Sequence, residues 1–162
     1  MALSPYLFET GVFVLDAPSN RDFILESAAM AAAGVIAGAE HAELLGALIA
    51  RENQSPTGTP EGVAFPHAMI PELPASKVVA IRTSSPVEFG PGSSCDLIFA
   101  MFGDANQPWE HVRLLARLAR ITHRPETRDR LRSARDAAAL LDVGAHGDGR
   151  APAAPSPRAP RP

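Results

Sequence analysis

KVVAIRTSSPVEFGPGSSCDLIFAMFG (77–103) is the stretch that decides the fold, because it holds two apolar runs separated by a polar connection. The runs over residues 77–84 and 95–103 are rich in β-branched and large apolar residues, which predicts two β-strands. Between them, residues 85–94 contain proline, glycine and serine, which are typical of a connection between strands. Two shorter runs, at residues 11–16 and 62–65, predict further strands.

Stretches with helical spacing lie before, between and after these strands. The first is rich in alanine, begins after an N-cap at Ser19 or Asn20 and ends near Gly34 or Gly38. A second runs from about Glu40 to residue 53, and further helical stretches cover residues 108–123 and 126–142. Because strands and helices interleave along the chain, the sequence predicts an α/β fold.

Length and composition indicate one globular domain with a tail. The chain has 162 residues, of which 46% are hydrophobic, enough for a single core. After residue 143 no apolar side chain larger than alanine occurs, and proline, alanine and arginine dominate. Such a segment buries too little surface to offset its ordering entropy. We therefore predict a domain over residues 1–143 and a disordered tail over residues 144–162.

Charge and cysteine content exclude several classes of function. The formal net charge is −3, so no overall basic field favours nucleic acid as a partner. Cys95 is the only cysteine, which rules out an internal disulfide and suits a reducing compartment. The first residues resemble neither a signal peptide nor a membrane anchor, so we expect neither. These features predict a cytoplasmic protein without direct membrane insertion.

The stretch over residues 108–123 places a histidine on the apolar side of a helix. At 100° per residue, His111 shares a face with Leu114, Leu118 and Ile121. Opposite them lies a row of four arginines, which is typical of a solvated face: Arg113, Arg117, Arg120 and Arg124. A buried histidine bonded to backbone is one interpretation of His111. The other is anion binding, because the first turn of a helix offers free N–H groups.

His67 follows a proline at the end of the run GVAF (62–65), where we expect a strand to give way to a loop. Three interpretations apply to it: a structural histidine, a metal ligand, or a nucleophile that attacks a phosphoryl group. His67 and His111 lack the spacing and further ligands of a zinc site. Phosphate-loop and dinucleotide motifs do not occur either, so the sequence predicts no metal and no cofactor.

Three motifs, taken in order, resemble one known family. They are ARENQSPTGTPEGVAFPHA (50–68), VEFGPGSSCDLIFAMFG (87–103) and EHVRLLARLAR (110–120). Together they are similar to the fructose/mannitol-type enzyme IIA domain of the bacterial sugar phosphotransferase system. That family also includes the nitrogen-regulatory enzyme IIA proteins. The resemblance implies a mixed β-sheet flanked by helices.

The resemblance also implies roles for individual residues. His67 matches the histidine that accepts a phosphoryl group from the histidine-containing phosphocarrier protein. His111 matches a second histidine that assists at the site by donating a hydrogen bond. Arg51, followed by Glu52, matches an arginine that stabilises the charge of the phosphoryl group. No cofactor is implied.

One position departs from the family pattern. Pro60 stands where family members carry the first glycine of a G-x-G sequence. Proline lacks an N–H group and cannot take a positive φ angle, so we expect a loop of different shape before His67. Whether His67 can accept a phosphoryl group efficiently therefore depends on the shape of this loop.

Three functions remain open at this point. The first is a phosphohistidine carrier that passes its phosphoryl group to an enzyme IIB during sugar uptake. The second is a regulatory protein whose phosphorylation state controls binding to a target protein. The third is a degenerate domain that binds partners without being phosphorylated.

Overall fold

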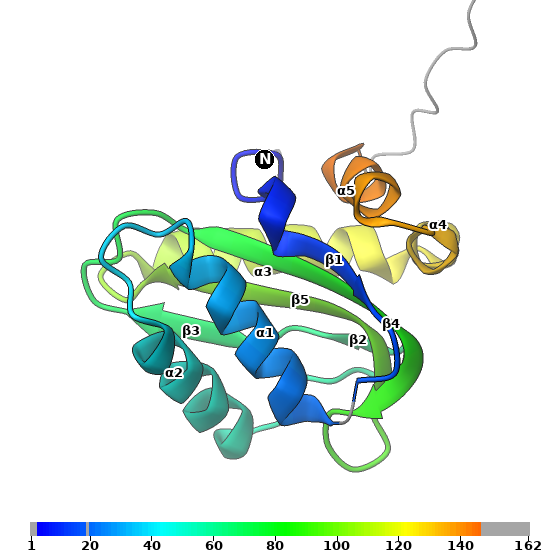
Figure 1. Cartoon of the computed structure of the whole chain (residues 1–162), viewed down its shortest axis with the longest axis horizontal. Coiled ribbons are helices and arrows are strands. Elements are labelled where there is room, and N and C mark those ends of the chain that lie inside the picture. Colours follow the sequence, from blue (N-terminus) through cyan, green and yellow to red (C-terminus); the bar gives the residue numbers. More distant parts are fainter. Residues whose placement is uncertain (1–2, 19, 147–162) are drawn as a thin grey trace, which may run out of the picture.

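The central feature of the fold is a long antiparallel pair of strands. The computed structural model describes residues 3–18 and 20–146 (Figure 1). β4 (Lys77–Glu88) pairs with β5 (Ser94–Asp104), with a register irregularity between Arg82 and Val87. β4 therefore extends through residues expected to form a connection, and only residues 89–93 join the two strands. A bulge lets a strand continue past residues that break its pairing, which is why the turn residues did not mark its end.

Parallel strands complete the sheet on both sides of this pair. β1 (Val12–Leu15) follows a 3-10 turn, η1 (Glu9–Gly11), and pairs with β4. β2 (Val63–Ala64) and β3 (His67–Ile70) both pair with the free edge of β5. The five-stranded sheet is thus mixed, as predicted. His67 begins a strand instead of following one, so the expectation of a loop at this position was wrong.

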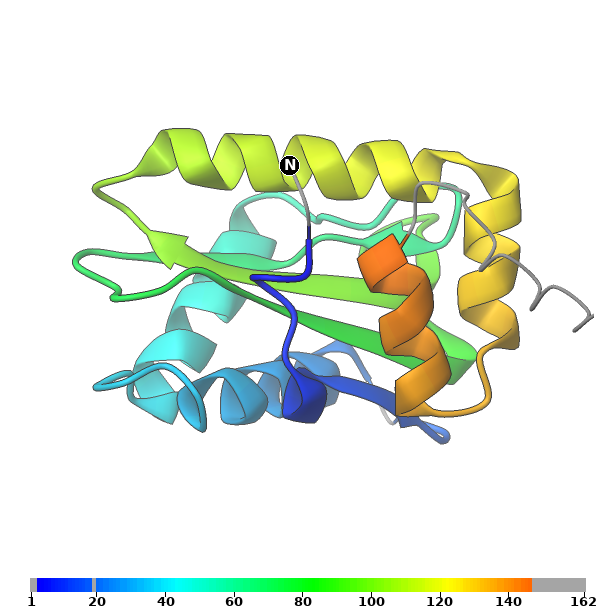
Figure 2. The same ribbon diagram turned by 90° about the horizontal axis from the view of Figure 1, so that it is seen from above.

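Two layers of helices cover the sheet (Figure 2). α1 (Arg21–Ala33) and α2 (His41–Gln54) lie on one face, where they pack in one hydrophobic core with Ile98, Ala100 and Phe102 of β5. α3 (Pro108–His123), α4 (Pro125–Ser133) and α5 (Ala137–His146) lie on the other face, against Leu97, Phe99 and Met101. Side chains that alternate along β5 therefore serve two different cores.

Side-chain caps mark where two of the helices begin. The side chain of Asn20 accepts a hydrogen bond from the N–H of Phe23, so the predicted cap of α1 is confirmed. The stretch 126–142 was expected to be helical, and the structure divides it into α4 and α5. α5 begins directly after Asp136, whose carboxylate accepts a hydrogen bond from the N–H of Ala139 and caps this new helix. α5 also includes residues 144–146, which we had assigned to the tail; residues 147–162 lie outside the described part.

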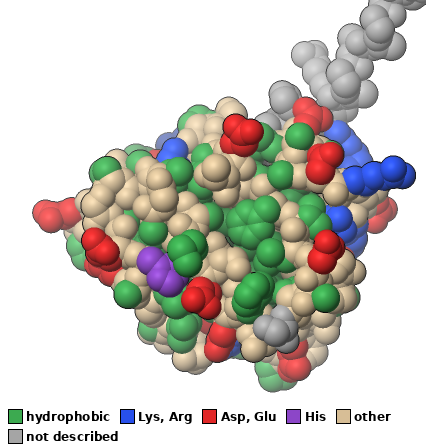
Figure 3. All heavy atoms as spheres, viewed as in Figure 1, with side chains coloured by type: hydrophobic (Ala, Val, Ile, Leu, Met, Phe, Trp, Pro, Cys, Tyr) green, Lys and Arg blue, Asp and Glu red, His purple; other side chains and the backbone are tan. Residues whose placement is uncertain are grey.

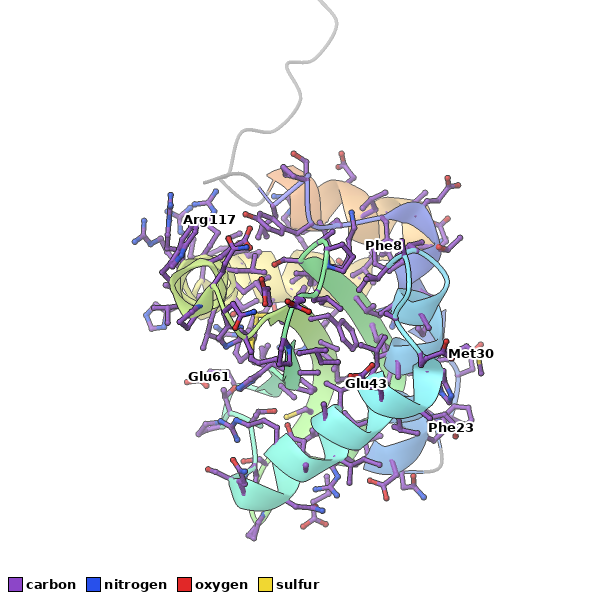
Figure 4. The ribbon with its side chains drawn as sticks, turned by 90° about the vertical axis from the view of Figure 1, so that its left-hand side faces the viewer. Phe8, Phe23, Met30, Glu43, Glu61 and Arg117 are labelled. Carbon is purple, nitrogen blue, oxygen red and sulfur yellow. The ribbon has the colours of Figure 1, made fainter. Side chains whose placement is uncertain are left out.

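The outer faces of the two helical layers carry different side chains. The face over α1 and α2 shows hydrophobic side chains at its centre with acidic side chains around them (Figure 3). Phe23 and Met30 of α1 are exposed there and point away from the sheet (Figure 4). On the opposite side of the molecule, Arg117 lies on the outer side of α3. Within residues 3–18 and 20–146, no helix combines the length and the apolar character that crossing a membrane requires.

Candidate functional site

The site lies at the edge of the sheet, where helices of both layers can reach the same side chain. Ala68 and Ile70 of β3 are buried in the core of α1 and α2. Because side chains alternate along a strand, His67 faces the other side, toward α3. β3 is an edge strand, so its outer side is open to the end of α2 as well. His67 is half-buried at this meeting point.

The hydrogen bonds of His67 determine which ring nitrogen carries the proton. Its Nδ1 lies 3.0 Å from the carbonyl oxygen of Phe65. A carbonyl only accepts hydrogen bonds, so in the neutral ring Nδ1 is the protonated nitrogen. Nε2 then holds the lone pair, and it accepts a hydrogen bond of 2.8 Å from Nε of Arg51. The geometry therefore makes Nε2 the ring nitrogen that is able to act as a nucleophile.

Arg51 reaches His67 from the last turn of α2. A second hydrogen bond, of 2.8 Å from its Nη1 to the carbonyl oxygen of Ser55, holds the guanidinium beside the ring. Ser55 terminates α2, and its own N–H bonds back to the carbonyl of Arg51. The cation is thus fixed by the end of the helix that carries it.

His111 approaches His67 from the other layer. The centroids of the two imidazole rings are 4.7 Å apart, and the rings are tilted by 40°. Burial, followed by the proximity of His67 and Arg51, lowers the pKa of His111 to about 4. Burial also lowers the pKa of His67, and Arg51 adds to this effect, while the bond to Phe65 and the carboxylate of Glu52 oppose it. Both rings are therefore neutral at neutral pH.

Sequence reasoning missed the role of Thr57 and left that of Glu52 undefined. Glu52 is only 1% exposed, and its carboxylate accepts hydrogen bonds from the N–H and the hydroxyl of Thr57. A signal was present in the sequence, because Glu52 follows Leu44 and Leu48 at the four-residue spacing of the buried face of α2. A carboxylate on such a face requires hydrogen-bond partners.

Pro60 occupies a turn that accommodates it. The N–H of Gly62 donates to the carbonyl oxygen of Thr59 at 3.1 Å, which closes a four-residue turn. Pro60 is the second residue of this turn, a position where its fixed φ is favoured and its missing N–H is not needed. Gly62 has a φ of +83° and supplies the backbone conformation that proline cannot adopt.

Other reactive groups do not contribute to the site. Burial raises the pKa of the Cys95 thiol to about 11, so this cysteine is a packed residue of the core. In the described part of the chain, no group of three or more His, Cys, Asp or Glu side chains could hold a metal ion. The arrangement is instead suited to group transfer onto Nε2 of His67, with a cation beside the reacting atom.

Comparisons with known proteins identify the family and the fold of the chain. A family model described as "Phosphoenolpyruvate-dependent sugar phosphotransferase system, EIIA 2" matches residues 6–144. A nitrogen regulatory protein of Pseudomonas aeruginosa is 34% identical over 98 residues, which cover 59% of this chain and 64% of that relative. The nitrogen regulatory protein of Bradyrhizobium diazoefficiens is 30% identical over 127 residues, covering 77% of this chain and 82% of the relative. A crystal structure of nitrogen regulatory protein IIA-Ntr from Neisseria meningitidis matches with a TM-score of 0.76 and 27% identity, over 85% of this chain and 95% of that one.

Proposed function

Because the chain belongs to the EIIA 2 family of the phosphoenolpyruvate-dependent sugar phosphotransferase system, we propose that it carries a phosphoryl group on Nε2 of His67. The donor is the histidine-containing phosphocarrier protein, and the acceptor is an enzyme IIB or a regulatory target. The observation that carries this proposal is the pair of hydrogen bonds of His67, which protonates Nδ1 and leaves a lone pair on Nε2 beside Arg51. The single cysteine suits a reducing, cytoplasmic setting for this exchange.

The transfer is an in-line displacement at phosphorus. The lone pair of Nε2 attacks the phosphorus atom, the donor's N–P bond breaks, and its electron pair remains on the donor's ring nitrogen. His67 loses no proton, because Nδ1 keeps its hydrogen, so its ring becomes cationic as the new N–P bond forms. The carbonyl oxygen of Phe65 accepts from Nδ1–H at 3.0 Å and stabilises that positive charge.

Arg51 has two roles in this scheme. Before transfer, its Nε–H occupies the lone pair of Nε2, so attack requires the guanidinium to shift. The bond from Nη1 to Ser55 keeps it close, and its other N–H groups then bind phosphoryl oxygens. Neutral His111 has one ring N–H, which donates to a further phosphoryl oxygen. Both residues stabilise charge that develops during transfer.

A second candidate output is regulation instead of sugar uptake. It is supported by the two relatives and the solved structure named as nitrogen regulatory proteins. Both functions require that His67 accepts a phosphoryl group. The turn at Pro60 supports a phosphorylated protein over a degenerate one, because the proline fits the loop that leads to His67.

The test is phosphorylation with the general phosphotransferase components and labelled phosphoenolpyruvate. We expect acid-labile, alkali-stable label on the wild type, none on His67→Ala, and full label on the control His123→Ala, which changes an exposed histidine. An unlabelled wild type would overturn the proposal and favour partner binding without phosphorylation. Label that moves on to an added enzyme IIB supports transport, whereas label that stays on the chain supports regulation.

A further inference from the structure

Glu52 holds the loop that precedes His67 by two hydrogen bonds to Thr57, which we call the clamp. Its side chain is buried, although a buried carboxylate is costly unless its oxygens are hydrogen-bonded. Oε2 accepts from the N–H of Thr57 at 3.1 Å, and Oε1 accepts from the Thr57 hydroxyl. Both oxygens of the carboxylate thus hold one residue, by its backbone and by its side chain.

Thr57 begins a narrow hairpin that leads from Glu52 to the reactive ring. Its carbonyl oxygen accepts from the N–H of Phe65 at 3.4 Å, at the base of the hairpin. Nearer the tip, Gly58 bridges Ala64 in an antiparallel manner. Phe65 then presents its carbonyl oxygen to Nδ1 of His67 at 3.0 Å. A continuous path of hydrogen bonds therefore joins the carboxylate of Glu52 to the imidazole.

We propose that Glu52 is a positioning residue that fixes the proton of His67 on Nδ1, through Thr57 and the carbonyl of Phe65. This inference rests on the proposed function for its catalytic consequence, but the tautomer itself can be measured without phosphoryl transfer. If the clamp is lost, the N–H and hydroxyl of Thr57 are left without acceptors, and the first strand of the hairpin loosens. The Phe65 carbonyl then no longer selects Nδ1–H, and the donation from Nε of Arg51 to Nε2 is the one remaining hydrogen bond that favours this tautomer. A proton on Nε2 removes the nucleophilic lone pair.

The sheet provides the competing explanation. Pro66, which follows Phe65, accepts a hydrogen bond of 2.8 Å from the N–H of Met101, and β2 pairs with β5 just before it. If these bonds alone fixed the Phe65 carbonyl, Glu52 would only stabilise the fold. A direct reading of the His67 tautomer separates the two explanations.

The experiment compares Glu52→Ala and Thr57→Val with the conservative variant Glu52→Gln. A glutamine can still accept from the N–H of Thr57 and donate to its hydroxyl, so it preserves the clamp without the charge. Glu43→Gln, at an exposed position of the same helix, is the matched control for loss of one carboxylate. Nitrogen NMR of the imidazole reads the tautomer in the unphosphorylated protein, and single-turnover labelling from the phosphorylated phosphocarrier protein reads the rate.

We expect the Nδ1–H form in the wild type, Glu52→Gln and Glu43→Gln. In Glu52→Ala and Thr57→Val we expect a mixture of tautomers and a rate lower by about ten- to a hundredfold, as small misplacements cause. Should Glu52→Ala fail to fold, Thr57→Val decides by the same two measurements. A wild-type tautomer in the folded clamp variants would overturn the inference whatever their rate, and so would a mixed tautomer with an unchanged rate. An unlabelled wild type would overturn the proposed function alone, because the tautomer is still measured.

Discussion

Arg51→Gln is the substitution that most directly tests the chemistry of the site. It removes the cation whose Nε lies 2.8 Å from Nε2 of His67, and with it the planar group that Nη1 anchors to Ser55. Loss of one preorganised donor at a site of developing charge slows catalysis by about 10²–10³-fold. We therefore expect the rate of phosphoryl acceptance to fall by at least about a hundredfold. Arg51→Lys keeps the positive charge but lacks the planar guanidinium group. Its rate of phosphoryl acceptance should therefore fall by a smaller factor, about tenfold.

The pH dependence separates two ways in which Arg51 acts. Burial is the main cause that lowers the pKa of His67, and the charge of Arg51 adds to it, so removal of Arg51 raises that pKa. In acid, the variant therefore has less neutral imidazole than the wild type. Above about pH 8 the ring is neutral in both proteins, and this difference disappears. The rate difference should persist there, because it arises in the transition state.

Single-turnover transfer of label from the phosphorylated phosphocarrier protein, measured from pH 6 to pH 8.5, is the assay. Arg130→Gln, an exposed arginine of α4, is the control and should transfer at the wild-type rate. A rate for Arg51→Gln within threefold of the wild type would refute the role of Arg51. A deficit that closes at high pH would show that Arg51 acts only on the ionisation of His67.

Two further predictions concern stability. The pKa of His111 is about 4 in the folded protein against 6.5 ordinarily, so the unfolded chain binds the additional proton as pH falls from 7 to 4. The free energy of unfolding should fall over that range in urea titrations, and His111→Gln should weaken this dependence; an equal effect of the exposed His123→Gln would contradict the assignment. Gly62→Ala should lower the free energy of unfolding by about 1–2 kcal/mol. The reason is that φ is +83° at this position and a Cβ would lie 2.8 Å from Nη2 of Arg132. Gly38→Ala, with a φ of +75° and no atom within 4 Å, isolates the backbone cost, and an equal loss in both variants would disprove the steric part.

The prediction from sequence succeeded where the signal is local. The apolar runs that became β1, β4 and β5, the cap at Asn20 and the helical stripe of α3 all follow from spacing within a few residues. The prediction failed where contacts with a neighbouring strand determine the secondary structure. This is the case at the bulge that extends β4 and at the strand that begins with His67. Pairing with β5 supplies the hydrogen bonds in both cases, and periodicity along one segment does not record it.

The sequence by itself determined most of the helices and strands of this protein. The family pattern singled out His67, His111 and Arg51 as the residues of interest. Only the tertiary structure decided how they meet. An interrupted edge strand places His67 where α2 and α3, from opposite faces of the sheet, both reach its ring. The structure also decided which ring nitrogen is unprotonated, because that depends on the hydrogen bonds of His67 to the carbonyl of Phe65 and to Nε of Arg51. Contacts of this kind depend on sheet register and burial, which no short stretch of sequence specifies.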